Sequence, residues 1–197
     1  MVYAATTNSC SIQLSTDVKG FAPIILTDNA GSDFQLFKPT GDVTYLPQGT
    51  QLQLVCTGNK NFIEATNEAS LELKCSKGSF VDANNNAYEL SELVCKSIPS
   101  SSLRITAEEC SNGNGYIYQT GFNINNQFYG PVFEICYSNV TENTFYTHNT
   151  LNGAAMDSKY ILYLHIYLTT MYIISCKLII STHPLIESIA SPIKSSS

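Results

Sequence analysis

The chain has 197 residues, which is enough to bury the core of one ordinary domain or of two small ones, and its formal net charge is −6. The charge is uneven: residues 1–158 hold seven Lys or Arg and fifteen Asp or Glu, whereas residues 159–197 hold three Lys and one Glu. An acidic surface repels phosphate backbones and anionic membranes. The composition therefore argues against binding of nucleic acid by residues 1–158.

Residue patterns typical of β-strands dominate the first third of the chain. Helical periodicity is poor up to about residue 150. Residues 21–27 (FAPIILT) form a short apolar run typical of a buried strand, and Pro23 favours an edge position for it. In residues 43–58, Pro47 and Gly49 separate two extended runs, and the second run alternates Leu with Gln. This pattern predicts a hairpin with one solvent-exposed face.

A second hairpin is predicted over residues 70–82, where Leu alternates with Glu and Lys before a Lys77-Gly78 turn. We expect a further strand through residues 89–96 (ELSELVCK). Residues 97–102 (SIPSSS) contain only Pro and Ser after one Ile and are the best candidate for a linker.

Three more strand-like runs follow the linker, at residues 115–124, 131–138 and 144–151. The sequence therefore predicts a mainly β fold in two β-rich units, residues 1–97 and residues 103–158. No internal repeat of fixed period is present.

Seven cysteines are dispersed along the chain, and one of them, Cys176, lies in an apolar tail. No two form a CxxC pair, and spacings of fifteen residues or more do not match zinc-finger ligands. An even set of dispersed cysteines with few charges predicts a disulfide framework from an oxidising compartment, with free buried thiols as the alternative. The sequence does not choose among the fifteen connectivities that six cysteines allow. The disulfide candidates are Cys10, Cys56, Cys75, Cys95, Cys110 and Cys136.

One glycosylation sequon, Asn139-Val140-Thr141, agrees with an extracellular location, and Asn139 is the glycosylation candidate. The first ten residues (MVYAATTNSC) contain no basic region followed by an apolar run, so no signal peptide is visible. We therefore expect a secreted protein whose true start is missing from this chain.

Two patterns are similar to known functional sites but lack residues that those sites require. Gly113 and Gly115 lack the third glycine and the following helix of a dinucleotide-binding loop, so we expect a tight turn there. His148 beside Asn149 could be a general base next to a metal-holding amide, but no second histidine or carboxylate cluster supports such a site. A surface or interstrand histidine is the better interpretation.

A third pattern begins like a calcium loop, with Asp82 followed by Asn at alternating positions. Such a loop needs Gly at its sixth position and a bidentate Glu at its twelfth, where this chain has Ala87 and Leu93. We expect a solvated turn. The residues themselves thus assign no catalytic residue and no metal ligand.

Several segments resemble the amino-terminal part of secreted DNA/RNA non-specific endonucleases of the arthropod type. Residues 45–58 (YLPQGTQLQLVCTG) and 75–80 (CSKGSF) are similar to a region that precedes the nuclease domain, and residues 120–154 are similar to the segment that opens it. The last of these segments includes the run Thr144, Tyr146, Thr147 and His148. The resemblance covers about residues 10–157.

This resemblance implies an accessory β-rich disulfide-containing domain at residues 1–97, followed by the first strands of an incomplete α+β (ββα-metal) nuclease domain at residues 103–158. In that family a histidine of an Arg-Gly-His motif activates water, an asparagine holds a hydrated Mg²⁺, and DNA and RNA are the partners. This sequence contains no Arg-Gly-His, and its one arginine is Arg104. No residue of this chain matches a catalytic or metal-binding residue of that family, and no specific protein partner is expected.

The tail, residues 159–197, differs in composition from everything before it. Residues 159–182 have the length of a membrane helix, but His165, Lys177 and several hydroxyl side chains interrupt the run. The residues from Tyr160 to Thr182 include no Gly, Ala, Pro, Arg, Asp or Glu. The junction DSKY can be encoded with GTAAGT, the usual start of an intron. We hypothesise translation through an intron, with a membrane anchor as the alternative, and expect no membrane partner.

The leading hypothesis is therefore a fragment of a secreted sugar-non-specific endonuclease that hydrolyses phosphodiester bonds of DNA and RNA with Mg²⁺. The fragment alone is expected to be inactive and to bind no cofactor, because the catalytic motif is absent from it. The alternative is a non-enzymatic secreted or membrane-tethered β-rich binding module that uses exposed Tyr and Asn side chains. The sequence leaves open whether the chain acts as an enzyme.

Overall fold

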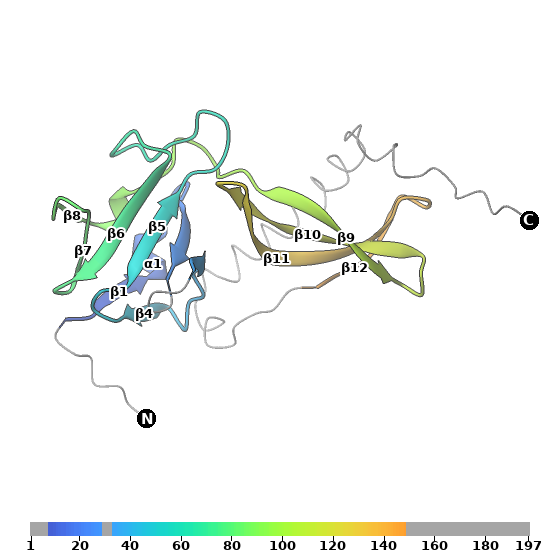
Figure 1. The fold of residues 1–197 in the computed structure, drawn as a ribbon, viewed down its shortest axis with the longest axis horizontal. Coiled ribbons are helices and arrows are strands. Elements are labelled where there is room, and N and C mark those ends of the chain that lie inside the picture. The colour runs from blue at the N-terminus through green and yellow to red at the C-terminus, as the bar shows by residue number, and fades with distance from the viewer. Residues whose placement is uncertain (1–7, 29–32, 149–197) are drawn as a thin grey trace, which may run out of the picture. The chain divides into compact units, whose positions relative to one another are not determined.

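The computed structural model describes residues 8–28 and 33–148, which all belong to one compact unit, Met1–Ser158. These residues form twelve strands in three antiparallel sheets, with one short α-helix and one 3-10 helix (Figure 1). The predicted mainly β class is confirmed.

Two of the three sheets lie in the first 97 residues. The larger has six strands in the order β3-β2-β5-β6-β7-β8, and the smaller pairs β1 with β4. The six strands are β2 (Ile24–Thr27), β3 (Gln35–Leu36), β5 (Gln51–Val55), β6 (Ser70–Ser76), β7 (Ser79–Val81) and β8 (Ala87–Tyr88). The remaining elements are β1 (Cys10–Gln13), α1 (Leu14–Asp17), β4 (Val43–Leu46) and the 3-10 helix η1 (Leu90–Glu92).

The third sheet follows the predicted linker and has the order β12-β11-β10-β9. Its strands are β9 (Ser102–Cys110), β10 (Gly115–Ile124), β11 (Gln127–Ser138) and β12 (Asn143–His148). The three strand-like runs predicted after the linker are confirmed as β10, β11 and β12, although residues 149–151 of the last run lie outside the described residues. Strand β9 was not expected, although Leu103, Ile105 and Ala107 alternate with polar residues along it, which is a signal that could have indicated a strand.

The predicted hairpin over residues 43–58 is wrong. Both runs are extended, but β4 pairs with β1, whereas β5 pairs with β2 and β6. The Gly49 amide donates to the Cys75 carbonyl oxygen at 2.8 Å, and the Cys75 amide donates to the Thr50 carbonyl oxygen at the same distance. The connection between the two runs is therefore bonded to β6, and it does not fold β5 back onto β4.

The predicted solvent-exposed face of β5 is confirmed only at Gln51, which is exposed. Gln53 is only 9% exposed and Val55 only 6% exposed. Val55 belongs to an apolar cluster with Ile24, Leu26 and Ile124, and Phe122 and Tyr129 of the third sheet pack against that cluster. Strand β5 thus has apolar neighbours on both faces, because its other face contributes Leu52 and Leu54 to the main core. That core contains Cys10, Ile12, Leu46, Leu52, Leu54, Cys56, Ile63, Leu73, Cys75, Phe80, Leu90, Leu93 and Cys95.

Two further expectations for the first unit need correction. Strand β2 is not an edge strand, because it lies between β3 and β5, and Pro23 precedes it without interrupting the ladder. The strand expected over residues 89–96 is instead the 3-10 helix η1 followed by a single bridge from Cys95 to Ile63. The Leu93 amide donates to the Leu90 carbonyl oxygen, which closes the helical turn.

The predicted hairpin over residues 70–82 is confirmed. Ser76 pairs with Ser79, so Lys77 and Gly78 form a two-residue turn between β6 and β7. Their φ angles are 52° and 85°, as a type I′ turn requires, and this turn matches the twist of the flanking strands.

The segment predicted as a linker is bound along its length to a neighbouring loop. The Ser97 amide donates to Asn61 Oδ1, and Asn61 Nδ2 donates back to the Ser97 carbonyl oxygen, each at 3.0 Å. Thr57 Oγ1 donates to the Ser100 carbonyl oxygen at 2.6 Å. Asn61 is only 4% exposed, so these bonds satisfy a buried amide and fix the path of the chain toward β9.

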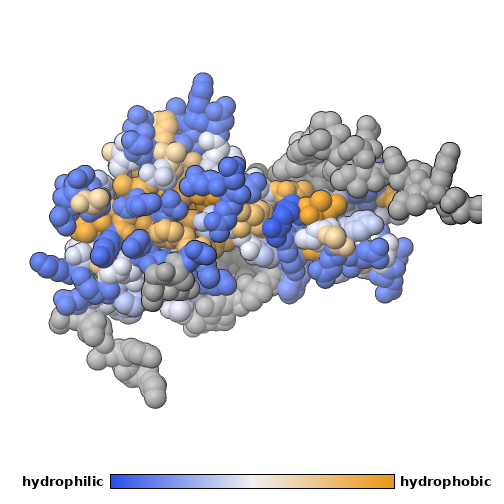
Figure 2. Space-filling model, viewed as in Figure 1, coloured by the Kyte–Doolittle hydropathy of each residue, from blue (hydrophilic) through white to orange (hydrophobic). Residues whose placement is uncertain are grey.

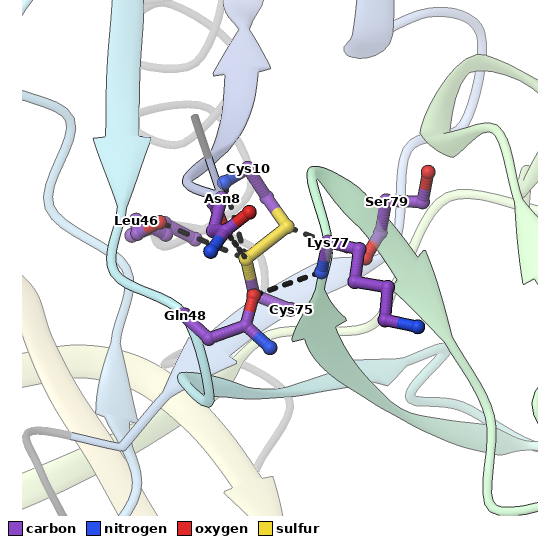
Figure 3. The surroundings of a disulfide bond; sticks show 7 residues. All are labelled: Asn8, Cys10, Leu46, Gln48, Cys75, Lys77 and Ser79. Atoms are coloured by element: carbon purple, nitrogen blue, oxygen red, sulfur yellow. Dashed lines mark hydrogen bonds between the residues drawn. A yellow bond between two sulfur atoms is a disulfide. The ribbon is translucent and has the colours of Figure 1, made fainter. Parts of the chain in front are cut away.

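The six cysteines before the tail form three disulfides: Cys10–Cys75, Cys56–Cys95 and Cys110–Cys136. Figure 3 shows the first, which joins β1 to β6 next to Leu46, the last residue of β4. The Cys10 amide lies 3.1 Å from Cys75 Sγ, and the Lys77 amide donates to Gln48 Oε1 at 2.8 Å. The expected disulfide framework is therefore present.

No helix within the described residues is long and apolar enough to span a membrane. The apolar run 159–182, with the intron and anchor hypotheses attached to it, lies outside the described residues, as does Cys176.

Gly121 provides a test of the packing in the third sheet. A Cβ atom there would lie 2.4 Å from the Tyr129 carbonyl oxygen and 2.6 Å from Phe128 Cζ. We expect Gly121→Ala to lower the free energy of unfolding by about 1–3 kcal/mol, because the backbone of β11 has to move. Urea denaturation followed by circular dichroism measures this loss.

The matched control is Thr147→Ala on the exposed strand β12, which we expect to change stability by less than about 0.5 kcal/mol. Equal urea midpoints for the two variants would contradict the close approach of β10 and β11 at Gly121.

Candidate functional site

Four polar side chains, one from each strand of the third sheet, form a row across it, which we call the polar row: Arg104, Gln119, Glu134 and His148. The strand register pairs Arg104 with Gln119, Gln119 with Glu134, and Glu134 with His148. Directly opposed residues of antiparallel strands point to the same face of a sheet. The register alone therefore places all four side chains on one face.

Side-chain contacts join the polar row from end to end. The Arg104 guanidinium donates to Gln119 Oε1, and Gln119 Nε2 donates to Glu134 Oε1 at 2.8 Å. The second carboxylate oxygen, Glu134 Oε2, lies 3.5 Å from His148 Nδ1. Because Gln119 accepts on one side and donates on the other, its amide orientation is fixed by its two neighbours.

An aromatic ring lies beside one end of the polar row. The Arg104 Cζ atom lies 4.3 Å from the centre of the Phe128 ring, a cation–π distance. The ring in turn lies close against the backbone of β10 at Gly121, where no Cβ atom would fit. Gly121 thus allows Phe128 to support the guanidinium plane of Arg104.

The polar row places four kinds of polar group on one face of the third sheet. Glu134 engages Nδ1 of the imidazole, and the His148 side chain is 64% exposed. Guanidinium, amide, carboxylate and imidazole groups together provide both hydrogen-bond donors and acceptors. The space-filling view also shows hydrophilic residues over most of one face of the molecule, with apolar residues scattered among them (Figure 2). Exposed aromatic side chains include Tyr45, Tyr116, Phe145 and Tyr146.

Sequence reasoning missed the polar row, because it considered His148 only with its neighbour Asn149, which lies outside the described residues. The hairpin between β11 and β12 turns after Ser138, which pairs with Asn143. Counting outward from that turn would pair Glu134 with Thr147. A register shift between Cys136 and Tyr137 moves the pairing by one residue, to His148.

Asp82 lies in a solvated turn, as expected for the sequence that begins like a calcium loop. Its Oδ1 accepts hydrogen bonds from the amides of Asn84 and Asn86 at 2.8 Å, and its Oδ2 accepts from Asn86 Nδ2 and from the Tyr88 hydroxyl. The side-chain bond from Asn86 is the largest cause of a lowered pKa of Asp82, opposed by desolvation. The turn's own donors therefore occupy the carboxylate.

The glycine pair expected to form a tight turn does so. Gly113 has a φ of 80° and lies between β9 and β10, and Gly115 begins β10. The Asn114 amide donates to the Ser111 carbonyl oxygen at 3.2 Å, which closes the turn.

Two tyrosines are buried on the third sheet and meet edge to face, with ring centres 5.8 Å apart: Tyr118 and Tyr137. Burial is the main cause that raises the pKa of each phenol, and the charge of Glu142 adds to it at Tyr137. The Tyr118 hydroxyl donates to Oδ1 of Asn139, the glycosylation candidate, at 2.8 Å. Asn139 lies exposed in the turn between β11 and β12.

Within residues 8–28 and 33–148, no group of three or more His, Cys, Asp or Glu side chains is placed to hold a metal ion. The residues described here therefore offer no fit for the Mg²⁺ site that the resemblance implies for the whole family, and no metal-dependent step is derived from them.

The contact between Arg104 and Phe128 can be measured with a double-mutant cycle. We expect Arg104→Ala, Phe128→Ala and their combination to give a coupling energy of about 0.5–1 kcal/mol in urea denaturation, because the guanidinium lies over a half-buried ring at the protein surface. The control cycle combines Arg104→Ala with Phe145→Ala on β12, and its coupling should be close to zero. A coupling no larger than that of the control cycle would contradict the stacked arrangement.

Two curated proteins are similar to this chain, both from the tsetse fly Glossina morsitans morsitans. Salivary protein Tsal1 is 36% identical over 152 residues, covering 75% of this chain and 37% of the relative. Salivary protein Tsal2A is 34% identical over 145 residues, covering 73% of this chain and 37% of the relative. No family model and no solved structure matches the chain. The chain thus spans little more than a third of the length of these salivary relatives.

Proposed function

We propose that this chain is the disulfide-stabilised, non-catalytic part of a secreted endonuclease that hydrolyses DNA and RNA without sugar specificity. The observation that supports this proposal most is the fold of residues 120–154. Most of this segment, which resembles the opening of the nuclease domain, lies in the consecutive paired strands β10, β11 and β12. The resemblance thus covers three neighbouring strands of one four-stranded sheet.

Secretion is supported by two independent observations. The six cysteines before the tail are all paired in disulfides, which persist in oxidising compartments. The two similar tsetse proteins are both named salivary proteins. We infer an extracellular location for this chain as well.

In this proposal, the catalytic residues belong to sequence that this chain does not contain. The sequence contains no Arg-Gly-His motif, and the matched region covers only 37% of each salivary relative. In the proposed whole protein, the histidine that activates water and the asparagine that holds Mg²⁺ come from sequence other than this region. The matched region serves as the scaffold on which that catalytic part is built.

The charge of the chain agrees with a scaffold role. Residues 1–158 hold seven basic and fifteen acidic side chains, a net charge of −8, and Glu108 and Glu109 lie on the same strand as Arg104. Repulsion of phosphate by this acidic part leaves contact with DNA or RNA to the other part of the whole protein.

A second candidate function is a secreted binding module without enzymatic activity. The polar row favours it, together with the exposed ring of Tyr146, which lies two residues from His148 on β12 and therefore on the same face of the sheet. Such a surface could contact a sugar or a protein through planar stacking and hydrogen bonds.

We expect the purified, oxidised chain to leave plasmid DNA and double-stranded RNA uncut in the presence of Mg²⁺, with a known Mg²⁺-dependent nuclease as the positive control. Cleavage that EDTA abolishes would contradict the assignment of catalysis to residues outside this chain.

Since the binding module would also be inactive, the transcript of the gene separates the two candidates. The endonuclease proposal expects a spliced message that continues from about codon 158 into sequence encoding Arg-Gly-His. A message in which codons 159–197 form an ordinary exon followed by a stop would favour the binding module instead.

A further inference from the structure

The turn between β11 and β12 presents the Asn139-Val140-Thr141 sequon at the surface. Ser138 pairs with Asn143, so the four residues between them form the turn. Asn139 and Thr141 are exposed, and Val140 is 92% exposed. This sequence contains no other Asn-x-Ser/Thr triplet, so one site accounts for any N-linked glycan.

The two polar atoms of the Asn139 side chain have different environments. Its Oδ1 accepts a hydrogen bond from the Tyr118 hydroxyl at 2.8 Å, and Tyr118 is only 2% exposed. Within the described residues, no hydrogen bond engages Asn139 Nδ2. A buried hydroxyl without a partner is costly, so the carbonyl oxygen of Asn139 has a structural role that its nitrogen lacks.

We propose that Asn139 carries an N-linked oligosaccharide on Nδ2 while its Oδ1 continues to accept the Tyr118 hydroxyl. The glycosylated side chain remains an amide with an intact carbonyl oxygen, so both roles are compatible. The hydrogen bond fixes the first sugar relative to β10 and β11. The glycan then stands at the opposite end of β12 from His148, about 17 Å away along a six-residue strand.

The modification is a redox-neutral substitution. Asn139 Nδ2 forms a bond to the anomeric carbon of an oligosaccharide donated by a lipid diphosphate. The bond from that carbon to the diphosphate oxygen breaks, the lipid diphosphate leaves, and Nδ2 loses one proton. The hydroxyl of Thr141 supplies the third position that the acceptor triplet requires.

This inference rests on the extracellular location proposed above. The experiment therefore measures translocation of the chain separately from its glycosylation. The chain is translated behind a heterologous signal sequence with microsomes, and only protease-protected chains are analysed. The wild type should show one mass increment that an N-glycosidase removes, and both Asn139→Ala and Thr141→Ala should abolish it. Protected wild-type chains without that increment would overturn the proposal, whatever the nuclease and transcript experiments show.

The role of Oδ1 is tested by comparing the same two variants as purified folded proteins. Both lack the glycan, but only Asn139→Ala removes the partner of the Tyr118 hydroxyl. We expect Asn139→Ala to unfold at a lower urea concentration than Thr141→Ala, and Asn139→Asp, which keeps an acceptor oxygen, to lie closer to Thr141→Ala. Equal midpoints for all three variants would overturn the structural role of the hydrogen bond.

Discussion

Three disulfides are the constraint on which the rest of this structure depends. The strands of the first unit are short: β3 and β8 have two residues each, and β1, β2 and β4 have four. Sheets of such strands bury little apolar area per residue. The cystines close loops of 26 to 65 residues, and loop closure of this size stabilises a fold by about 3–4 kcal/mol per bond. Each cystine joins segments of the same unit, and none joins residues 1–97 to residues 103–158.

Within this one compact unit, the sheets of residues 1–97 and the sheet of residues 102–148 are instead connected by non-covalent packing on β5. One face of β5 lies in the core that contains two of the three disulfides, and Val55 on its other face clusters with Ile124 of β10. The hydrogen bonds of Asn61 and Thr57 to residues 97–100 fix the connecting segment at the same end of β5. The scaffold role proposed for the chain depends on these contacts, because a support can position a catalytic part only if its own sheets are held together.

Local patterns in the sequence predicted local structure well. The turn at Lys77-Gly78 and the run 115–124 were found because residue type and alternation determine a two-residue hairpin and a long strand. Strand partners could not be predicted from such patterns: the Leu–Gln alternation of β5 indicated an exposed face, yet Gln53 is buried on the face where Val55 clusters with Ile124. The contact of Glu134 with His148 could not be predicted from the sequence either, because a one-residue register shift determines which residues pair across β11 and β12.

The most direct test of this account is the pairing of the cysteines in the oxidised protein, read by mass spectrometry of a tryptic digest made without reduction. The structure predicts that peptide 1–19 is joined to peptide 75–77, that peptide 20–60 is joined to peptide 78–96, and that the peptide containing Cys110 and Cys136 is closed within itself. A cystine that joins either of these last two cysteines to Cys10, Cys56, Cys75 or Cys95 would contradict the account of two separately closed β-rich units.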